Sequence, residues 1–252
     1  MVPRGGPAER ADRPPRLTRA VGGTLRRVIV VLGRPGLPPP ASAIGGASLD
    51  IDGALGDEDR DDERTADTTA ATPPLLTTPI AIAAAAAGAR VEVVGSIGDD
   101  AAGDDVVVLL GRSGVGHAAL LRDPGGRTPT PPALRGTTDA PEAPDAEAGS
   151  WPLSRLEAED VELGLGYLVE YRVLVLAERL GPDAERVAIE AARFQGAAIV
   201  AIVPPGVAAS DELVAAGTVF EAPPDAGTRF TDLVGGLAAA LDRGTPLATA
   251  FS

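Results

Sequence analysis

The stretch whose residue types come closest to a known chemical motif is GRSGVGHA, at positions 111–118. It has the outline of a phosphate-binding loop, G-x-x-x-x-G-K-S/T, in which backbone amides cradle phosphates, the lysine binds them and the hydroxyl binds Mg²⁺. His117 occupies the lysine position and Ala118 the hydroxyl position. Because the phosphate cation and the magnesium ligand are both lost, we disfavour a nucleotide loop here.

The acidic run GDEDRDDERTAD, residues 56–67, is a second candidate, for calcium. Asp57, Asp59 and Asp61 alternate as in an EF-hand, but that motif needs glycine next and glutamate six positions further on. Asp62 and Thr68 stand there instead. Like charges repel and hold a chain in solvent, so the run is predicted to be a solvated segment.

Composition excludes several classes of site. The chain has 252 residues and a net charge of −14, and all 22 basic residues are arginine. A basic face for nucleic acid is therefore not expected. Cysteine is absent and the one histidine, His117, cannot form a multi-histidine metal site, so disulfides, zinc-thiolate sites and a cysteine nucleophile are excluded. We predict no metal centre built from side chains alone.

No apolar run reaches the roughly 18 residues needed to cross a bilayer. The Arg-rich start of the chain is followed by no apolar segment and cleavage site of signal-peptide form. We therefore expect a cytoplasmic protein with no membrane contact.

The first part of the chain is rich in proline, glycine and arginine. Within residues 1–40, only Val28 to Leu32 is typical of a short buried strand, and we expect the rest to be a disordered arm. A second strand-like stretch runs from Ala41 to Ile51, and residues 54–76 are predicted to be an irregular acidic insertion. The expected domain spans residues 41–252.

Further along, strand and helix patterns alternate. Gly88 and Gly244 are predicted to end helices, and Asp183 is predicted to cap one whose apolar face carries Val187, Ala191 and Phe194. The expected elements are a helix over 79–87, a strand over 91–94, a strand over 173–177, a helix over 183–194, a strand over 198–203 and a helix over 233–243. Strand, helix and strand in that order imply a right-handed βαβ unit and a parallel sheet.

The stretch AAAAAGARVEVVGSIGDDAAGDDVVVLLGRSGV, residues 83–115, resembles the N-terminal signature of the ribokinase/PfkB carbohydrate kinase family. That signature is a helix ending in Leu-Gly-Ala, a strand, Val-Gly-x-x-Gly-x-Asp-x-x-Gly, and a helix ending in Gly-Val. The matching positions are Gly88, Gly95, Gly98, Asp99, Asp100, Gly103, Gly114 and Val115. We interpret most of them as scaffold, with Asp99 or Asp100 capping the second helix. The resemblance also makes residues 111–118 the end of that helix.

Upstream, IGGASLDIDG (residues 44–53) is similar to the family's first strand, which ends at a substrate-holding aspartate. Asp50 matches that aspartate, and Gly45 and Gly46 match the glycines before it. A carboxylate at a strand's carboxyl end can accept hydrogens from two sugar hydroxyls. The alternative is that Asp50 is only a solvated strand end.

Residues 172–206 resemble the middle of the family, where a strand ends in Glu and Pro before a helix, and Glu178 and Pro182 match loosely. Residues 233–247, LVGGLAAALDRGTPL, resemble the helix after the family's catalytic motif, Asp-Thr-Thr-Gly-Ala-Gly-Asp. The resemblance implies ATP contacts at Asp225, Gly227 and Thr228.

The catalytic motif departs from the family here. Its glycine-rich turn binds phosphate through bare amides and its last aspartate deprotonates the acceptor hydroxyl. In this chain Thr228, Arg229 and Phe230 replace Gly-Ala-Gly, and Thr231 stands at the position of the base. Asp232, the candidate base, is one residue late, which rotates it by about 100° on a helix.

A second alignment is also open. If Pro223-Pro224-Asp225 stands for the family's Pro-Asn-Glu, the nucleotide-site strands are missing, because only residues 226–232 remain before the last helix. Around Leu75 to Pro79 the family's Gly-Gly and Asn are also replaced, so Asp50 would act alone.

The resemblance implies an α/β fold: a ribokinase-like three-layer sandwich with a mostly parallel central sheet, a reduced lid and a truncated C-terminal part. It implies ATP-dependent phosphorylation of a sugar or nucleoside hydroxyl, with ATP and Mg²⁺ as cofactors and weak or lost activity. The alternative functions are an inactive pseudokinase that binds a small polyol or acts as a scaffold, and a decayed gene product. A homodimer stays open.

Overall fold

A parallel sheet organises the part of the chain that the structure describes. The computed structural model describes residues 28–39, 75–131, 152–168 and 170–250. Its six strands lie in the order β3-β2-β1-β4-β5-β6 and every pairing is parallel. Their bounds are β1 Ile29–Leu32, β2 Val91–Gly98, β3 Gly116–Asp123, β4 Val173–Leu176, β5 Ala198–Val203 and β6 Thr218–Glu221.

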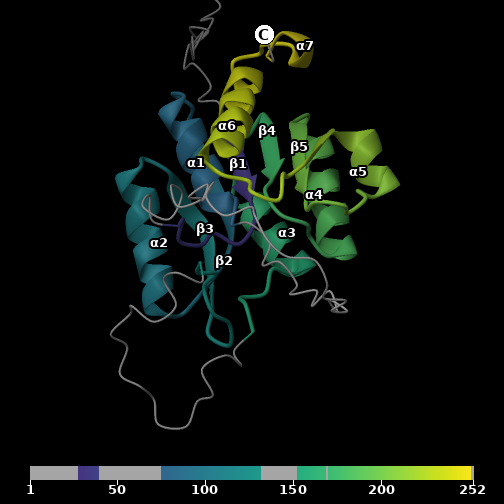
Figure 1. Cartoon of the computed structure of the whole chain (residues 1–252). Helices are drawn as coiled ribbons and strands as arrows, with labels where there is room; N and C mark the ends of the chain where they lie inside the picture. Colours follow the sequence, from purple (N-terminus) through teal and green to yellow (C-terminus); the bar gives the residue numbers. More distant parts are fainter. Residues whose placement is uncertain (1–27, 40–74, 132–151, 169, 251–252) are drawn as a thin grey trace, which may run out of the picture.

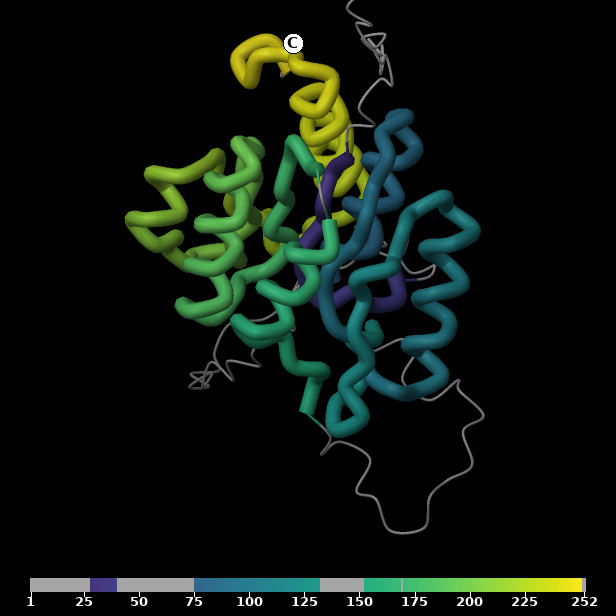
Figure 2. The backbone as a smooth tube through the Cα atoms, turned by 180° about the vertical axis from the view of Figure 1, so that it is seen from behind, coloured from purple at the N-terminus to yellow at the C-terminus, as the bar shows by residue number. Residues whose placement is uncertain are grey.

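Helices cover both faces of this sheet (Figures 1 and 2). One apolar cluster joins the sheet to α1 (Thr77–Ala86), α2 (Ala101–Arg112) and α6 (Thr228–Asp242). A second cluster joins the opposite face to α3 (Ala158–Gly166), α4 (Pro182–Gln195) and α5 (Asp211–Ala216). A short helix, α7 (Leu247–Ala250), follows α6. The expected three-layer α/β sandwich is confirmed.

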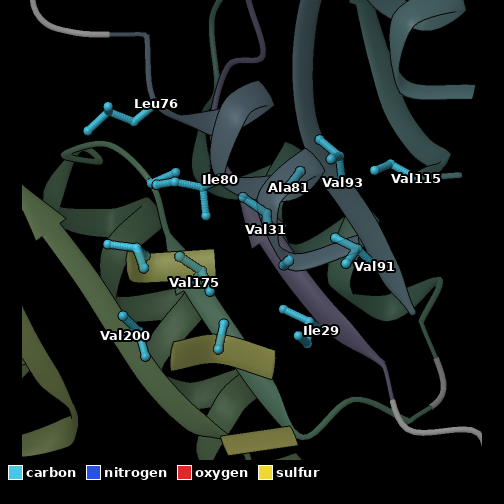
Figure 3. Close-up of a cluster of buried hydrophobic side chains, with 14 of the residues drawn as sticks. Ile29, Val31, Leu76, Ile80, Ala81, Val91, Val93, Val115, Val175 and Val200 are labelled. Carbon is cyan, nitrogen blue, oxygen red and sulfur yellow. The ribbon is translucent and has the colours of Figure 1, made fainter. Parts of the chain in front are cut away.

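Strand β1 lies at the centre of the core. Ile29 and Val31 point into the cluster under α1 and α6 (Figure 3), whereas Val30 and Leu32 belong to the cluster on the other face. All four side chains are fully buried. A parallel strand that is covered on both faces is expected to be a continuous apolar run, and the sequence IVVL meets that requirement.

The central position of β1 corrects the expected domain boundary. The sequence analysis placed residues 1–40 outside the domain, but residues 29–32 pair with β2 and β4. A short buried strand was predicted at Val28 to Leu32, but its proline- and glycine-rich flanks placed it within the expected arm. The remaining predictions for residues 1–27 and 40–74 lie outside the described residues.

Helix α4 begins differently from the prediction. Gly181 is its N-cap and Pro182 its first residue, so Asp183 lies in the first turn and is not the cap. Proline suits that position because its missing N–H would be unpaired there. Of the predicted apolar face, Val187 and Ala191 are partly buried and pack against the second cluster, whereas Phe194 is 89% exposed. The buried side chains of α4 are those of Ala184, Ala188, Ile189 and Ala192.

The glycine-rich stretch 111–118 forms a helix end and a strand start. Helix α2 ends at Arg112, Gly114 has a φ of 71°, and β3 begins at Gly116. The side chain of His117 lies beside the carbonyl oxygen of Val115, with Nδ1 at 3.3 Å. The interpretation of this stretch as a helix end is therefore confirmed.

Helices α1 and α6 approach each other closely on the sheet. A Cβ atom added at Gly235 would lie 2.6 Å from Ala83 Cβ and 2.6 Å from the Ala84 nitrogen. Only glycine lets the two backbones meet at this distance. Helix α1, TTPIAIAAAA, carries no charged side chain and is covered by both the sheet and α6. Among the described helices, none combines the length and apolar character that a bilayer span requires.

Tyr171 generates a stability prediction. Its hydroxyl is buried without a hydrogen-bond partner, and burial raises the pKa of Tyr171 from 10.0 to about 12. Replacing Tyr171 with Phe should leave the free energy of unfolding at pH 7 unchanged or raise it by about 1 kcal/mol, because an unpaired polar group is removed.

The pH dependence gives the sharper test of Tyr171. Above pH 10 the unfolded chain loses the phenolic proton that the folded chain retains, so the wild type should lose stability as pH rises toward about 12. Tyr171→Phe should reduce that loss, as measured by urea unfolding at several pH values. The exposed Tyr167 serves as control, and an equal effect of Tyr167→Phe would contradict the prediction.

Candidate functional site at the carboxyl edge of the sheet

The strand order creates a switch point between β1 and β4. From β1 the chain proceeds through α1 to β2 on one side, and from β4 it proceeds through α4 to β5 on the other. The helix that follows β1 lies on one face of the sheet, and the helix that follows β4 lies on the other. In open α/β sheets, ligands bind in the crevice outside the carboxyl ends of such strands. A ligand site is therefore expected at this edge of the sheet.

An ion pair joins the two strand ends at the switch point. The guanidinium of Arg34, just after β1, binds the carboxylate of Glu178, just after β4, through Nε at 3.1 and 3.0 Å and Nη2 at 2.7 Å. The backbone N–H of Arg34 also donates to Glu178 Oε1 at 2.6 Å. Hydrogen bonding to Glu178 raises the pKa of Arg34 above its ordinary value, although burial opposes this.

Gly33 makes room for this ion pair. A Cβ atom there would lie 2.5 Å from Thr77 Oγ1 and 3.3 Å from Glu178 Cγ, and the φ of Gly33 is 157°. A larger residue would therefore collide with the start of α1 and with the glutamate. Glycine between β1 and Arg34 lets the strand end turn while both neighbours stay close.

Two cavities adjoin the ion pair. The larger has a volume of about 270 Å³ and the smaller about 120 Å³. Both are lined by Arg34, Glu178 and Arg179. The larger one is completed by Leu153, Ser154, Arg155, Leu156, Glu157, Leu180 and Gly181.

The glycine-aspartate signature at the end of β2 positions a neighbouring loop. Asp100 is the N-cap of α2 and accepts the Gly103 N–H at 2.8 Å. Its carboxylate also accepts the Thr128 hydroxyl at 2.6 Å and the Thr128 N–H at 2.9 Å. The hydroxyl oxygen of Thr128 in turn accepts a hydrogen bond from the Gly98 N–H at 3.0 Å. The signature thus serves the scaffold, as predicted, but the sequence analysis missed Thr128.

The segment that walls the larger cavity is fixed by hydrogen bonds to strand ends. Ser154 Oγ donates to the Ser96 carbonyl oxygen at 3.0 Å. Asp123, at the end of β3, accepts the N–H of Arg155 at 2.9 Å and of Gly125 at 2.9 Å. These two backbone hydrogen bonds lower the pKa of Asp123. Residues 153–157 are therefore held over the carboxyl edge.

The residues predicted to contact ATP lie together before and at the start of α6. Asp225 is exposed in the connection from β6, Gly227 is the N-cap of α6, and Thr228 is its first residue. The helix begins earlier than the predicted residue 233. Thr228, Arg229 and Phe230 therefore form its first turn, where Phe230 packs on the core and the other two are exposed.

The two candidates for the catalytic base lie on different sides of α6. Thr231 is 3% exposed and its hydroxyl donates to the Thr228 carbonyl oxygen at 3.0 Å. Asp232 is exposed on the flank of the helix, past its first turn. The first turn itself contains no acidic residue. Among the described residues, no group of three or more histidine, cysteine or acidic side chains could hold a metal ion.

The substrate-side candidates Asp50, Gly45 and Gly46 lie outside the described residues. The first side chain beyond the central strand is instead that of Arg34, which the sequence analysis assigned to a linker. Glu178 and Pro182 stand where the loose family match placed them, after a strand and at the first position of a helix.

Asp100 should contribute strongly to stability. Asp100→Ala removes an N-cap and the anchor of Thr128, so the free energy of unfolding should fall by about 2 to 4 kcal/mol. Urea denaturation measures this change. Asp105→Ala, at an exposed position of the same helix, is the matched control and should change stability by less than about 0.5 kcal/mol. Equal effects of the two substitutions would contradict the role of Asp100 as N-cap and anchor of Thr128.

The Arg34–Glu178 pair should show strong coupling. Arg34→Met should destabilise the fold by about 2 kcal/mol, because it leaves the partly buried carboxylate without its cation. A double-mutant cycle with Glu178→Leu should give a coupling energy of about 1 to 3 kcal/mol. The exposed Arg186–Glu190 pair is the control, where about 0.3 to 0.5 kcal/mol is expected. Coupling as weak as in the control would contradict the prediction.

Comparisons with known proteins identify the fold. No protein-family model matches the chain, and no curated protein matches it. A solved structure from E. coli, provisionally assigned as ribokinase II and in complex with ATP and Mg²⁺, is 12% identical, with a TM-score of 0.50 over 89% of each chain. A PfkB protein from Polaromonas sp. JS666 is 14% identical, with a TM-score of 0.49 over 89% of this chain and 91% of that one. At these identities the likeness speaks for architecture: the chain has the ribokinase-like α/β fold.

Proposed function

We propose that this protein is a carbohydrate or nucleoside kinase of the PfkB type in which phosphotransfer to a sugar hydroxyl is weak or lost. The proposal is supported by the ribokinase-like fold and by the cavities at the carboxyl edge of the sheet. The observation that carries it is the first turn of α6, which offers backbone amides but no carboxylate.

Phosphotransfer needs donors for the developing negative charge and a carboxylate that takes the proton of the attacking hydroxyl. At α6 the donors fit. Gly227, the N-cap, has no side chain over the first amides, and Arg229 adds an exposed cation at the same helix end. ATP and Mg²⁺ would supply the phosphoryl group and the charge that neutralises it. The residues at this helix end therefore suit phosphate binding.

The requirement for a base is met poorly. Asp232 is exposed on the flank of α6, whereas Thr231, at the aligned position, is buried and has its hydroxyl bonded to Thr228. A neutral threonine hydroxyl is also far too weak a base to take the proton as a carboxylate does. The slow step would therefore be removal of the acceptor proton, and the pseudokinase alternative follows if Asp232 cannot reach it.

Turnover of ATP tests the proposal. The purified protein is incubated with Mg-ATP and a panel of sugars and nucleosides. It should release ADP far more slowly than kinases do, whose turnover rates are typically about 1 to 100 per second. Coupled ADP release measures the rate, with Asp232→Ala as the partner variant. Turnover near 1 per second or faster that Asp232→Ala abolishes would show a working base and overturn the proposal of weak or lost activity.

Binding of ATP separates a pseudokinase from a protein without a nucleotide site. Arg229→Ala should weaken Mg-ATP binding in calorimetry by about tenfold, because one charge-assisted contact to phosphate is lost. Arg243, just past the far end of α6, is the matched control, and Arg243→Ala should leave the affinity unchanged. Absence of any ATP binding would reject α6 as a nucleotide site.

A further inference from the structure

The larger cavity at the switch point has an unusual charge pattern for a site that would hold a neutral sugar. Sugar hydroxyls are commonly held by carboxylate oxygens with free acceptor capacity. Both carboxylates on the wall of this cavity, those of Glu178 and Glu157, are already engaged within the chain. The question is therefore which ligand groups the remaining side chains can bind.

The acceptor sites of Glu178 are largely occupied by Arg34. An ionised carboxylate offers about four lone-pair sites. The Arg34 N–H and Nε donate to Oε1, and Nε and Nη2 donate to Oε2, so all four contacts come from a single residue. A sugar hydroxyl could reach this carboxylate only by displacing a bidentate ion pair whose side chains are 28% and 21% exposed.

Glu157 is engaged as well, as the N-cap of α3. Its side chain accepts the N–H of Asp160, and its own N–H donates to Asp160 Oδ2 at 2.9 Å. This reciprocal arrangement satisfies two N–H groups at the start of the helix. Drawing Glu157 into a ligand contact would break the cap and cost about 0.5 to 2 kcal/mol.

The cations of the same wall keep free donors. The guanidinium has five N–H groups, and among the described residues those on Nη1 of Arg34 have no acceptor. Arg155 is 72% exposed and lies 3.8 Å from Asp123 Oδ2. Arg179 is exposed and lines both cavities, and in the described part of the chain it has no hydrogen bond or ion pair.

The net charge of −14 does not override this local pattern. Exposed charges farther away than about 8 to 10 Å are largely screened at physiological salt. Within that distance Arg34 is paired with Glu178 and Arg155 lies 3.8 Å from Asp123 Oδ2, whereas Arg179 has no ion-pair partner among the described residues. Arg179 is therefore the cation of this wall that a ligand's anionic group can engage.

We propose that this cavity binds a small molecule bearing a phosphate or carboxylate group, and that Arg179 is the residue that selects for this charge. Guanidinium binds either anion through two parallel hydrogen bonds. Leu153, Leu156 and Leu180 provide apolar surface for the ligand's carbon skeleton. The volume of about 270 Å³ lies near the lower end of ligand pockets, which suits a monosaccharide derivative. The inference rests on the proposed function only for the choice of a sugar skeleton.

Calorimetry with three probes tests the inference: D-ribose 5-phosphate, D-ribonate and neutral D-ribose. We expect at least one charged probe to bind at least about tenfold more tightly than ribose, because charge-assisted hydrogen bonds are the strong ones. Comparison of the phosphate with the carboxylate probe identifies which anion the cavity prefers.

The variants assign the effect to the cavity. Arg179→Ala should weaken binding of the charged probe by about 10- to 100-fold while leaving ribose binding unchanged. Arg186→Ala, on α4 shortly after Arg179 but outside the cavity, is the matched control and should have no effect. Equal binding of ribose and the charged probes, no effect of Arg179→Ala, or no binding of either charged probe would overturn the inference.

Failure of this inference is distinguishable from failure of the proposed function. The proposed function is judged by ADP release and by the effect of Arg229→Ala on Mg-ATP binding, neither of which involves Arg179. Binding of a charged probe that depends on Arg179 upholds the inference whether or not ATP is turned over. Fast turnover with a neutral sugar as acceptor, unaffected by Arg179→Ala, counts against the inference.

Discussion

The pairing of β1 with β2 on one side and β4 on the other is the interaction on which the described structure depends. In the order β3-β2-β1-β4-β5-β6, β1 joins the two halves of the sheet. Its four side chains enter both apolar clusters, so this central strand packs against both covering layers of helices. The same strand carries Arg34 to the carboxyl edge, where it meets Glu178, 144 residues away in the sequence.

Sequence patterns predicted the elements that rest on local rules. The cap by Asp100, the turns at Gly114 and Gly244, and strand β5 follow from side-chain chemistry and glycine φ values, which neighbouring residues determine. The central role of β1 could not be predicted in this way. The apolar run predicts a short buried strand, but its place between β2 and β4 depends on long-range pairing that the proline- and glycine-rich flanks do not indicate.

The site shows the same division. Glu178 was located by its position after a strand, but its partner Arg34 lay in a segment assigned to an arm, so the ion pair was unforeseen. The start of α6 was misplaced because Thr228, Arg229 and Phe230 carry no recognisable cap, and Gly227 caps without a side chain. Consequently the distance between Asp232 and the helix end, which decides the chemistry, required the structure.

The close contact of α1 with α6 has a consequence for how the chain reaches its fold. Residues 77–86 form an alanine-rich helix that packs side by side with residues 228–242, more than half the chain later. Because the two helices are far apart in the sequence, a long loop must close before their contact lowers the free energy, and this slows folding. During synthesis α1 leaves the ribosome well before α6. The apolar surface of this uncharged helix therefore stays open to aggregation or chaperone binding until α6 emerges.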